Sequence, residues 1–308
     1  GLILDEAQAV PQVFPALRGL IDDDRRRNGR FVVLGSAQPD LVRGVAESLA
    51  GRAAILDLSP LAACEAAAGE PRCEWRTLWL KGGFPDALGD HHTDWWDAYL
   101  RTVLERDLPQ YGVGADPVFM RRLLTMVAHA QSGIANASQF GAALGASFQT
   151  VQRHLNVLER IFLLRRLPPY FRNVGKRLVK APKLYLRDTG LLHHLLNIRS
   201  HEDLDSHPVR GASWETFVLE DILRREALAH PGSQAFFWRT AAGAEVDLVL
   251  ERGSARTAIE VKTAAGGSGR QVRTLREALV DIDAARGWIV DQGRGISIAI
   301  DNRIEHLA

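Results

Sequence analysis

The first 58 residues alternate between short apolar runs and segments with helical periodicity. Residues 1–4 are apolar and end at Asp5-Glu6, and residues 31–34 form a second run that ends at Gly35-Ser36. Between them, apolar side chains recur every three or four positions, at Val10, Val13, Phe14, Leu17, Leu20 and Ile21. This order predicts strand, helix and strand in a parallel sheet. A further helix is predicted over residues 40–50 and a third strand over 53–58.

The middle of the chain has a helical pattern in two parts. Residues 61–110 carry aromatic anchors around the turn Gly82-Gly83-Phe84-Pro85, which predicts a small helical lid. Residues 118–162 contain three helical stretches, with Ser138 and Ser147 suited to be N-caps and Gly145-Ala146 as a turn. That spacing indicates a helix-turn-helix, and the strand-like residues 163–167 and 178–186 are expected to form its wing.

The last hundred residues change pattern again. A polar segment at 201–208 precedes a predicted helix at 213–229 and strands at 235–238, 245–251 and 258–262. A helix at 271–283 and strands at 287–290 and 296–300 complete this region. The order of elements predicts a third, α/β domain.

The composition indicates the class of protein but does not indicate its partner. The 308 residues carry a net charge of +1, with 46% hydrophobic and 24% charged residues, which is typical of a globular protein. No apolar run approaches the roughly 18 residues needed to cross a bilayer, so we expect a cytoplasmic protein with no membrane partner. Cys64 and Cys73 are the only two cysteines, which supports neither a disulfide framework nor a zinc site.

Acidic residues at the end of the first strand are the first candidates for chemistry. In P-loop ATPases the Walker B strand ends in a carboxylate that helps to hold Mg²⁺, and a neighbouring carboxylate acts on the attacking water. Asp5 would hold the metal and Glu6 would be the catalytic base. Ser36, at the end of the next strand, would be a sensor of the γ-phosphate, and Arg52 an arginine finger for a neighbouring subunit. The alternatives are a solvated turn at Asp5-Glu6 and a surface role for Arg52.

The phosphate-binding loop G-x-x-x-x-G-K-[ST] does not occur in these 308 residues. Its backbone N–H groups and lysine normally cradle the phosphates of ATP. We therefore expect that this chain does not bind ATP tightly by itself, and that a truncated N-terminus accounts for the missing loop.

A basic segment lies in the middle of the chain. Eight Lys/Arg and no Asp/Glu occur from Arg165 to Arg187. Such a concentration favours salt-dependent contacts with nucleic acid phosphates. The candidates for nucleic acid binding are Arg153, Arg165, Arg166, Arg172, Lys176, Arg177, Lys180 and Lys183. The alternative is a winged-helix module that contacts proteins.

A third set of candidates lies in the C-terminal region. Asp247 and the sequence Glu260-Val261-Lys262 fall on two adjacent predicted strands, and Glu215 lies on the preceding helix. Alternation along a strand places Glu260 and Lys262 on one face. This is the pattern of a PD-(D/E)xK nuclease, in which Asp247 and Glu260 would hold a metal and the lysine would assist the attacking water. A relative that does not cleave DNA remains the alternative.

Taken together, these motifs give the chain a resemblance to a known family. It resembles the bacterial and archaeal AAA-type ATPases of the AAA_14-like kind that carry a C-terminal domain of unknown function 4143. The motifs that carry the resemblance are Leu4-Asp5-Glu6-Ala7-Gln8, Leu34-Gly35-Ser36-Ala37, Ser48-Leu49-Ala50-Gly51-Arg52, Gly82-Gly83-Phe84-Pro85, Tyr99-Leu100, Glu105-Arg106-Asp107-Leu108, Lys180-Ala181-Pro182-Lys183-Leu184-Tyr185, Asp188-Thr189-Gly190-Leu191, Glu245-Val246-Asp247 and Ile259-Glu260-Val261-Lys262.

The resemblance implies an α/β protein of four parts. These are the C-terminal part of a P-loop NTPase (AAA+) core at 1–60, a helical lid at 61–115, a winged helix-turn-helix at 116–200 and a PD-(D/E)xK nuclease-like domain at 201–308. It implies ATP and Mg²⁺ as cofactors of an intact ATPase. From the residues themselves we expect DNA or a protein as partner, and an arginine finger that acts on a neighbouring subunit favours a homo-oligomer formed through the ATPase core. A metal-dependent nuclease regulated by ATP and a non-enzymatic DNA- or partner-binding protein stay open as alternative functions.

Overall fold

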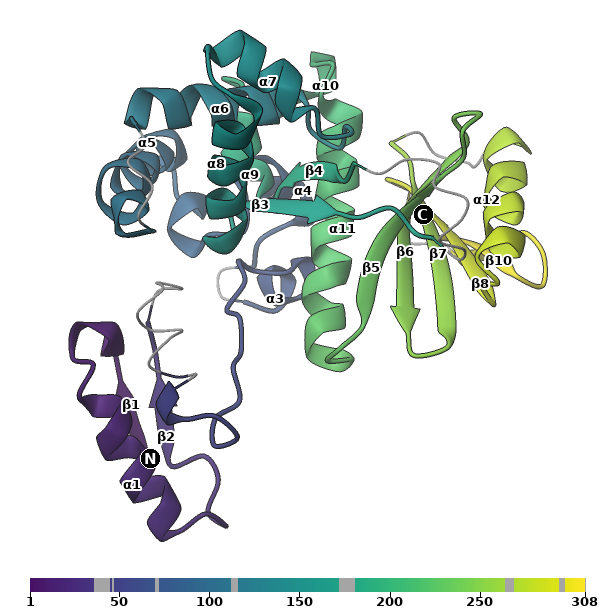
Figure 1. The fold of residues 1–308 in the computed structure, drawn as a ribbon. Coiled ribbons are helices and arrows are strands. Elements are labelled where there is room, and N and C mark those ends of the chain that lie inside the picture. The colour runs from purple at the N-terminus through teal and green to yellow at the C-terminus, as the bar shows by residue number, and fades with distance from the viewer. Residues whose placement is uncertain are drawn as a thin grey trace.

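The structure is a computed structural model, and it describes residues 1–35, 45, 47–69, 72–111, 116–171, 181–263, 269–293 and 297–307. A small N-terminal unit is joined by an extended segment to a helical body, and a twisted sheet lies on the other side of that body (Figure 1). Within the described residues, no helix is long and apolar enough to cross a membrane.

The N-terminal unit has the predicted strand–helix–strand order. Strand β1 (Leu2–Leu4) pairs in parallel with β2 (Phe31–Val33), in the register Leu2↔Phe31 to Leu4↔Val33. Helix α1 (Val13–Asp23) connects them after a short 3₁₀ turn (Ala7–Ala9). A small core of Ala7, Phe14, Leu17 and Leu49 lies between helix and strands. The predicted parallel pairing is confirmed.

The third strand predicted at 53–58 is wrong, because these residues form no strand with any part of the chain that the structure describes. Ile55, Leu56 and Leu58 are exposed, the last of them fully. An apolar run becomes a strand only when a neighbour satisfies its backbone hydrogen bonds. Of the helix predicted at 40–50, only Val45, Glu47 and Ser48 are described as helical.

The helical body extends from residue 61 to α11 and has a two-stranded sheet within it. Its elements are α3 (Ala63–Ala68), α4 (Trp75–Lys81), a 3₁₀ turn (Pro85–Leu88), α5 (His92–Thr102), a π-helical turn (Val103–Asp107), a 3₁₀ turn (Leu108–Tyr111), α6 (Pro117–His129), α7 (Ala137–Leu144), α8 (Phe148–Arg160), β3 (Leu164–Leu167), β4 (Lys183–Leu186), α9 (Thr189–Leu195), α10 (His201–Ser206) and α11 (Arg210–Ala229). Strands β3 and β4 are antiparallel, from Leu164↔Leu186 to Leu167↔Lys183. A helix-rich segment thus precedes a hairpin-like pair of strands.

Local capping explains where the helices of this body begin and end. Ser147 caps α8 as predicted, since its hydroxyl accepts a hydrogen bond from the Thr150 N–H at 3.1 Å. Gly145 ends α7 in the left-handed conformation, at φ 67°. The cap predicted at Ser138 is wrong, because the Asn136 side chain accepts the Gln139 N–H instead, at 3.0 Å. Asparagine and serine are equally good caps, so the pattern alone did not decide between them.

Two glycine-containing segments join the lid to α9. Asp188 caps α9 by accepting the Gly190 N–H at 2.8 Å, and its other oxygen accepts the Gly83 N–H at 2.9 Å. A Cβ atom on Gly190 would lie 1.9 Å from the carbonyl oxygen of Lys81. Only glycine allows this close approach of α9 to the lid. The lid and the segments after it also share one hydrophobic core.

A buried hydrogen-bond chain ties the lid to α9 and α11. The Trp79 indole N–H donates to the Ser213 hydroxyl at 2.9 Å, and that hydroxyl lies 2.7 Å from His193 Nε2. His193 Nδ1 lies 2.8 Å from the carbonyl oxygen of Leu80, so a neutral imidazole satisfies both ends of the chain. The His193 side chain is 1% exposed, so this imidazole belongs to the buried interior.

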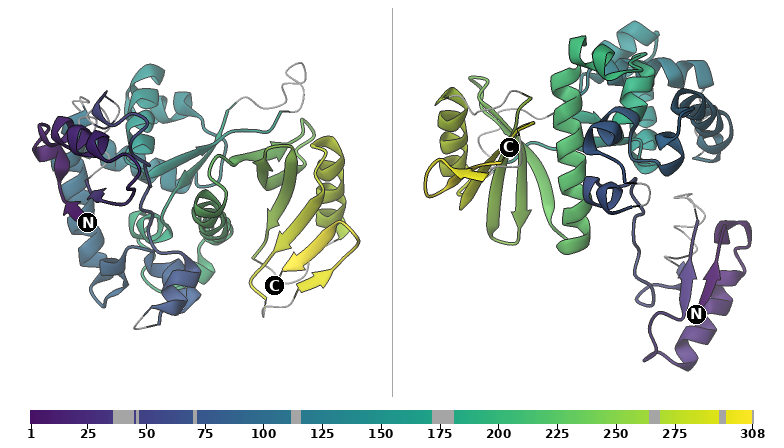
Figure 2. Two further views of the ribbon diagram at one scale, coloured as in Figure 1. Left: turned by 90° about the horizontal axis from the view of Figure 1, so that it is seen from below. Right: turned by 180° about the vertical axis from the view of Figure 1, so that it is seen from behind.

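The C-terminal sheet has six strands in the order β5-β6-β7-β8-β10-β9. They are β5 (Gln234–Arg239), β6 (Glu245–Arg252), β7 (Ala255–Val261), β8 (Arg286–Val290), β9 (Ser297–Ala299) and β10 (Ile304–Leu307), and α12 (Gly269–Asp281) connects β7 to the parallel β8. Residues Leu248, Leu250 and Ile259 join the core that includes α11, whereas Val249 and Ala258 pack with α12. Alternation along the strands therefore gives the sheet two covered faces, and α11 stands between the sheet and the helical body (Figure 2).

Candidate functional site

Asp5 and Glu6 lie at the carboxyl end of β1, beside the end of β2. The Glu6 N–H donates to the Asp5 carboxylate at 2.9 Å, and Glu6 has a left-handed backbone at φ 50°. The Leu34 N–H donates to the Leu4 carbonyl at 2.7 Å, and the Ala7 N–H donates to the Leu34 carbonyl at 3.2 Å. Left-handed backbone is uncommon for residues other than glycine and occurs often at functional sites. Both carboxylates are exposed at this edge of the parallel pair.

The lid comes close to this edge through its π-helical turn. The pKa of Arg106 is raised chiefly by a hydrogen bond with Asp107, and also by the charge of Glu6. Turns of π-helix are frequent at functional sites. Arg106 was not among the candidates from the sequence, although the Glu105-Arg106-Asp107-Leu108 motif contains it.

Of the other two predicted ATPase residues, one is placed and one is not. Ser36 lies outside the described residues. Arg52 forms a two-pronged ion pair with Asp22, with Nε–Oδ1 at 2.8 Å and Nη2–Oδ2 at 3.0 Å. This guanidinium, together with that of Arg25, lowers the pKa of Asp22 to about 2. The role of Arg52 as an arginine finger remains a prediction.

The C-terminal candidates come together between α11 and the sheet. The Lys262 ammonium lies 2.6 Å from Glu260 Oε1 and 3.8 Å from Asp247 Oδ2. The same Asp247 oxygen, Oδ2, accepts the Val261 N–H at 2.9 Å, which fixes this carboxylate against the sheet. Glu215 reaches the same region from α11. The four side chains predicted from the sequence, those of Glu215, Asp247, Glu260 and Lys262, therefore form one site. Glu245 lies beside them, and we call Glu215, Glu245, Asp247 and Glu260 the acidic cluster.

Lys183 lies inside the acidic cluster, which corrects its predicted role. Its Nζ is 2.5 Å from Glu245 Oε1, 3.0 Å from Glu215 Oε1 and 3.5 Å from Asp247 Oδ1. The residue is 2% exposed, so it cannot contact a phosphate backbone at the surface. Glu245 was not among the candidate site residues, although it lies two residues from Asp247 and therefore on the same face of β6.

Tyr185 completes the cluster from β4. Its hydroxyl donates to Glu215 Oε1 at 2.6 Å, and the ring is fully buried. Lys183 and Tyr185 are two residues apart on one strand, so their side chains point to the same side. This spacing of two residues is a signal in the sequence that Lys183 and Tyr185 can contact the same carboxylate, which in the structure is Glu215.

Burial sets the protonation behaviour of the cluster. Desolvation, together with the charge of Asp247, raises the pKa of Glu215 to about 7 and that of Glu260 to about 8. Lys183 and Lys262 oppose these shifts. Desolvation alone would lower the pKa of the Lys183 ammonium, but Glu215, Asp247 and Glu245 together raise it above its usual value.

Metal ligands were predicted at Asp5, Asp247 and Glu260. Across the described ranges, no group of three or more His, Cys, Asp or Glu side chains is arranged to hold a metal ion. The cations that contact the acidic cluster are the Lys183 and Lys262 ammonium groups and the Arg239 guanidinium, whose Nη1 lies 3.2 Å from Glu245 Oε2. As arranged, the cluster therefore fits an internal cation better than Mg²⁺.

The predicted phosphate-binding residues that are described are mostly engaged within the protein. Arg165 binds the buried Glu220, with Nη2–Oε2 at 3.0 Å, and Arg166 binds Glu159 with Nε–Oε2 at 2.8 Å. Arg153 is exposed on α8. The remaining candidates, Arg172, Lys176, Arg177 and Lys180, lie outside the described residues.

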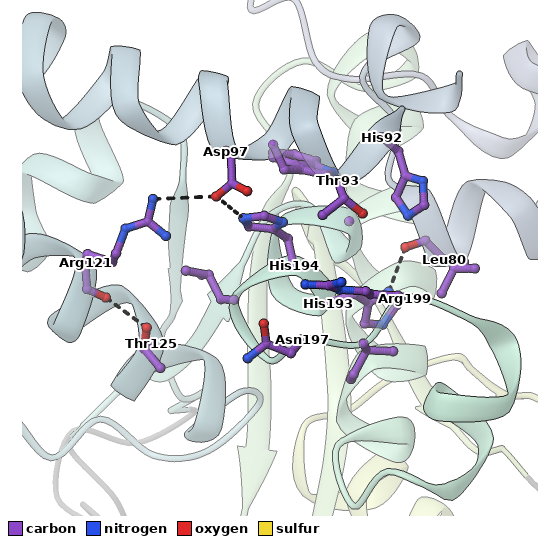
Figure 3. A pocket seen from close by; sticks show the side chains of 14 residues that line it. Leu80, His92, Thr93, Asp97, Arg121, Thr125, His193, His194, Asn197 and Arg199 are labelled. Carbon is purple, nitrogen blue, oxygen red and sulfur yellow. Dashed lines mark hydrogen bonds and ion pairs between the residues drawn. The ribbon is translucent and has the colours of Figure 1, made fainter. Parts of the chain in front are cut away.

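A polar pocket of about 180 Å³ lies between α5, α6 and the end of α9 (Figure 3). Asp97 is at its rim, 3.2 Å from His194 Nε2 and 3.9 Å from Arg121 Nη2. His92 and Arg199 line the same hollow. The carboxylate of Asp97 thus holds side chains from the lid, α6 and α9 together.

Three family models match successive parts of the chain. Residues 1–67 match an AAA domain, residues 72–202 a domain of unknown function (DUF8612), and residues 210–304 a domain of unknown function (DUF4143). The second match includes both the lid and the three helices with their pair of strands. This agrees with the single core that these parts share.

Two mycobacterial proteins are similar over nearly the whole chain. The uncharacterized proteins Mb2031c of Mycobacterium bovis and Rv2008c of Mycobacterium tuberculosis are each 41% identical over 298 residues, which is 95% of this chain. The match covers 65% of each relative, so the chain spans less than two thirds of their length. The chain therefore joins AAA-domain sequence to a C-terminal DUF4143 domain, which confirms its resemblance to the AAA-type ATPases with that C-terminal domain.

Proposed function

We propose that this chain is part of a Mg²⁺-dependent AAA-type ATPase that couples its nucleotide state to DNA or to a protein partner. The observation that carries the proposal is the position of Asp5 and Glu6 at the carboxyl edge of the parallel β1–β2 pair. Ligands of open parallel sheets bind at this edge. The AAA-domain match at residues 1–67 supports it.

Each residue at this edge would have its own role in ATP hydrolysis. Bound Mg²⁺·ATP would supply the phosphoryl group and the charge that activates it. Asp5 is placed to hold the metal, and Glu6 to orient the attacking water and accept its proton. Ser36 would sense the γ-phosphate, and Arg52 would act on the nucleotide of a neighbouring subunit after leaving Asp22.

This proposal requires a phosphate-binding loop from sequence upstream of Gly1. The 308 residues contain no such loop, and the chain matches only 65% of the length of its relatives. Without that loop, two exposed carboxylates offer a metal shell but nothing that holds the phosphates.

The test is ATP turnover by a chain extended upstream to include the loop. Glu6→Gln keeps the shape of the side chain but removes the base, so we expect turnover to fall by about 10²-fold or more. Glu47→Gln changes an exposed glutamate of the same unit and should leave turnover unchanged. Equal turnover in Glu6→Gln and the parent would remove Glu6 from the mechanism.

The convergence of Asp247, Glu260 and Lys262 favours a second candidate, metal-dependent cleavage of phosphodiesters. Carboxylates that hold a metal and a lysine that assists water are the parts this reaction needs. Incubation of the chain with branched and linear DNA in Mn²⁺ tests it, with Lys262→Ala as the comparison. Cleavage that is lost in Lys262→Ala would support the nuclease. Salt-sensitive DNA binding without cleavage would favour the non-enzymatic alternative.

A further inference from the structure

The pocket between α5, α6 and the end of α9 has more basic than acidic side chains in its lining. The guanidinium groups of Arg121 and Arg199 line it, together with the imidazoles of His92 and His194. Asp97 is the single carboxylate among the described residues of the lining. The two guanidinium groups outweigh this carboxylate, so the pocket carries a net positive charge even when its imidazoles are neutral.

The rim of this pocket is open to solvent, whereas part of its wall is not. The side chains of Arg121 and Asp97 are 46% and 53% exposed, and that of His194 is 11% exposed. The volume of about 180 Å³ is smaller than the roughly 300–1,000 Å³ of pockets that enclose drug-sized ligands. The pocket therefore suits a small ion, or one group of a larger molecule.

Several polar groups of the pocket are not satisfied within the described part of the chain. Arg121 Nη2 lies 3.9 Å from Asp97 Oδ1, which is an ion pair but is too long for a hydrogen bond. Arg199 is held through its backbone N–H, which donates to Asp203 Oδ2 at 3.0 Å, and not through its guanidinium. The buried Nδ1 of His92 has no hydrogen-bond partner there. Guanidinium donors without acceptors are suited to an oxyanion.

The backbone adds to the positive potential, because the pocket lies at the N-terminal end of α5 (Figure 3). His92 and Thr93 are the first two residues of this helix, and its N-cap residue makes no side-chain hydrogen bond to it. The positive end of a helix dipole stabilises an anion near the first turn. Burial, together with the charge of Lys81, lowers the pKa of His92. Helix, lysine and arginines thus all favour a negative ligand.

We propose that this pocket binds an oxyanion of the phosphate type, either free phosphate or the phosphate group of a small monoester. Arg121 and Arg199 supply the charge that a phosphate requires, and His92 lies at the helix end that faces it. Asp97 competes with the anion for Arg121. His194 Nε2, 3.2 Å from Asp97 Oδ1, retains the carboxylate when Arg121 turns to the anion. The site is separate from the β1–β2 edge and from the acidic cluster.

The experiment is isothermal titration calorimetry of the 308-residue chain with inorganic phosphate, at constant ionic strength in chloride. Arg121→Gln and Arg199→Gln each remove a charged donor and should weaken binding about tenfold or more. Arg122→Gln changes the exposed arginine next to Arg121, outside the pocket, and should stay within about twofold of the parent. Asp97→Asn removes the competing charge and should tighten binding about threefold or more.

Asp97→Asn distinguishes a binding site from a structural contact, because the loss of a structural contact would not tighten phosphate binding. The proposal is overturned if the parent shows no saturable binding of phosphate, or if Arg122→Gln weakens binding as much as Arg121→Gln. It is also overturned if Asp97→Asn does not bind more tightly than the parent. Circular dichroism shows whether each variant is folded, and Arg199→Gln carries the test if Arg121→Gln is not.

A second titration, with O-phosphoserine, distinguishes the two sources of the phosphate group. Tighter binding of O-phosphoserine than of inorganic phosphate supports a site for a monoester. Weaker or equal binding supports a site for the free ion. In either case Arg121→Gln should weaken both ligands by a similar factor, and a loss confined to one of them would contradict a shared phosphate position.

Discussion

The two groups of carboxylates in this protein lie in opposite environments. Asp5 and Glu6 are exposed at the edge of a two-stranded unit with a small core. Asp247 and Glu260 are buried between a long helix and a six-stranded sheet, and lysines neutralise them. The exposed pair needs further protein and a ligand before it becomes a site. In the buried cluster the fold itself supplies the cations, among them Lys183 and Lys262.

The same contrast appears in how each region is held together. The N-terminal unit depends on a few apolar contacts, whereas the body combines a large core with buried ion pairs. Buried charges are costly unless they are paired, so removing one partner is more damaging than removing an exposed pair. The following predictions use this difference.

The largest effect is expected at the buried Glu220. It is 2% exposed and binds Arg165 and Arg187. Glu220→Ala leaves both guanidinium groups without their carboxylate, so the free energy of unfolding should fall by about 3–5 kcal/mol. Urea unfolding measures it, with the exposed Glu202→Ala as control. Equal free energies of unfolding for the two variants would show that the ion pairs of the helical body do not contribute to its stability.

Stability should also depend on pH through His193. Burial lowers the pKa of His193 to about 4, from an ordinary value of 6.5. The unfolded chain then binds a proton that the folded chain does not. The contribution is fully present above pH 6.5 and is lost as the pH falls toward 4, on the order of 3 kcal/mol.

Unfolding free energies at pH 7.5 and 4.5 measure this contribution. His193→Asn does not titrate, so its loss between the two pH values should be smaller than that of the parent chain by this amount. His91→Asn changes an exposed histidine and should behave like the parent. An unchanged pH dependence in His193→Asn would contradict the assigned pKa.

The core of the N-terminal unit predicts a local effect. Leu17 is 2% exposed and packs with Phe14 and Leu49. Leu17→Ala should destabilise this unit by about 2 kcal/mol, at the low end for buried leucines, because a small core can close around the cavity. Hydrogen exchange should accelerate in residues 1–35 and remain unchanged in the C-terminal sheet. Equal acceleration in both regions would show that they unfold together.

The smallest effect on stability is expected at Arg52. Its pair with Asp22 lies at the surface, where ion pairs contribute little. Arg52→Ala should leave the melting temperature unchanged within error. In the extended protein it should lower ATP turnover only when subunits assemble, which mixing with Glu6→Gln subunits tests. A lower melting temperature with unaltered turnover would make Arg52 a structural residue.

The sequence predicted those features that depend on local pattern. Two apolar runs and one helical period indicated the parallel β1–β2 pair, and strand alternation indicated that Glu260 and Lys262 share a face. The third strand at 53–58 failed because pairing depends on a neighbour that the local pattern does not specify. The local pattern predicts Ser138 as a cap where Asn136 serves, because both positions suit a cap.

The role of Lys183 was beyond the reach of local pattern. It lies among eight basic residues, which is typical of an exposed surface, yet it pairs with residues 32 to 64 positions away. Only the packing of β4 against α11 and the sheet brings these charges together. The local pattern therefore predicted Lys183 as a phosphate ligand, whereas its long-range contacts make it the internal cation of a buried cluster.

ATP affinity tests most directly the claim that Asp5 and Glu6 are half of a nucleotide site. Fluorescent ATP binding is measured for residues 1–308 and for a chain extended upstream to include a phosphate-binding loop. The account predicts binding by the extended chain and none by residues 1–308 in the same range of concentration. Equal affinity of the two chains would contradict it, because the phosphates would then be held by residues other than that loop.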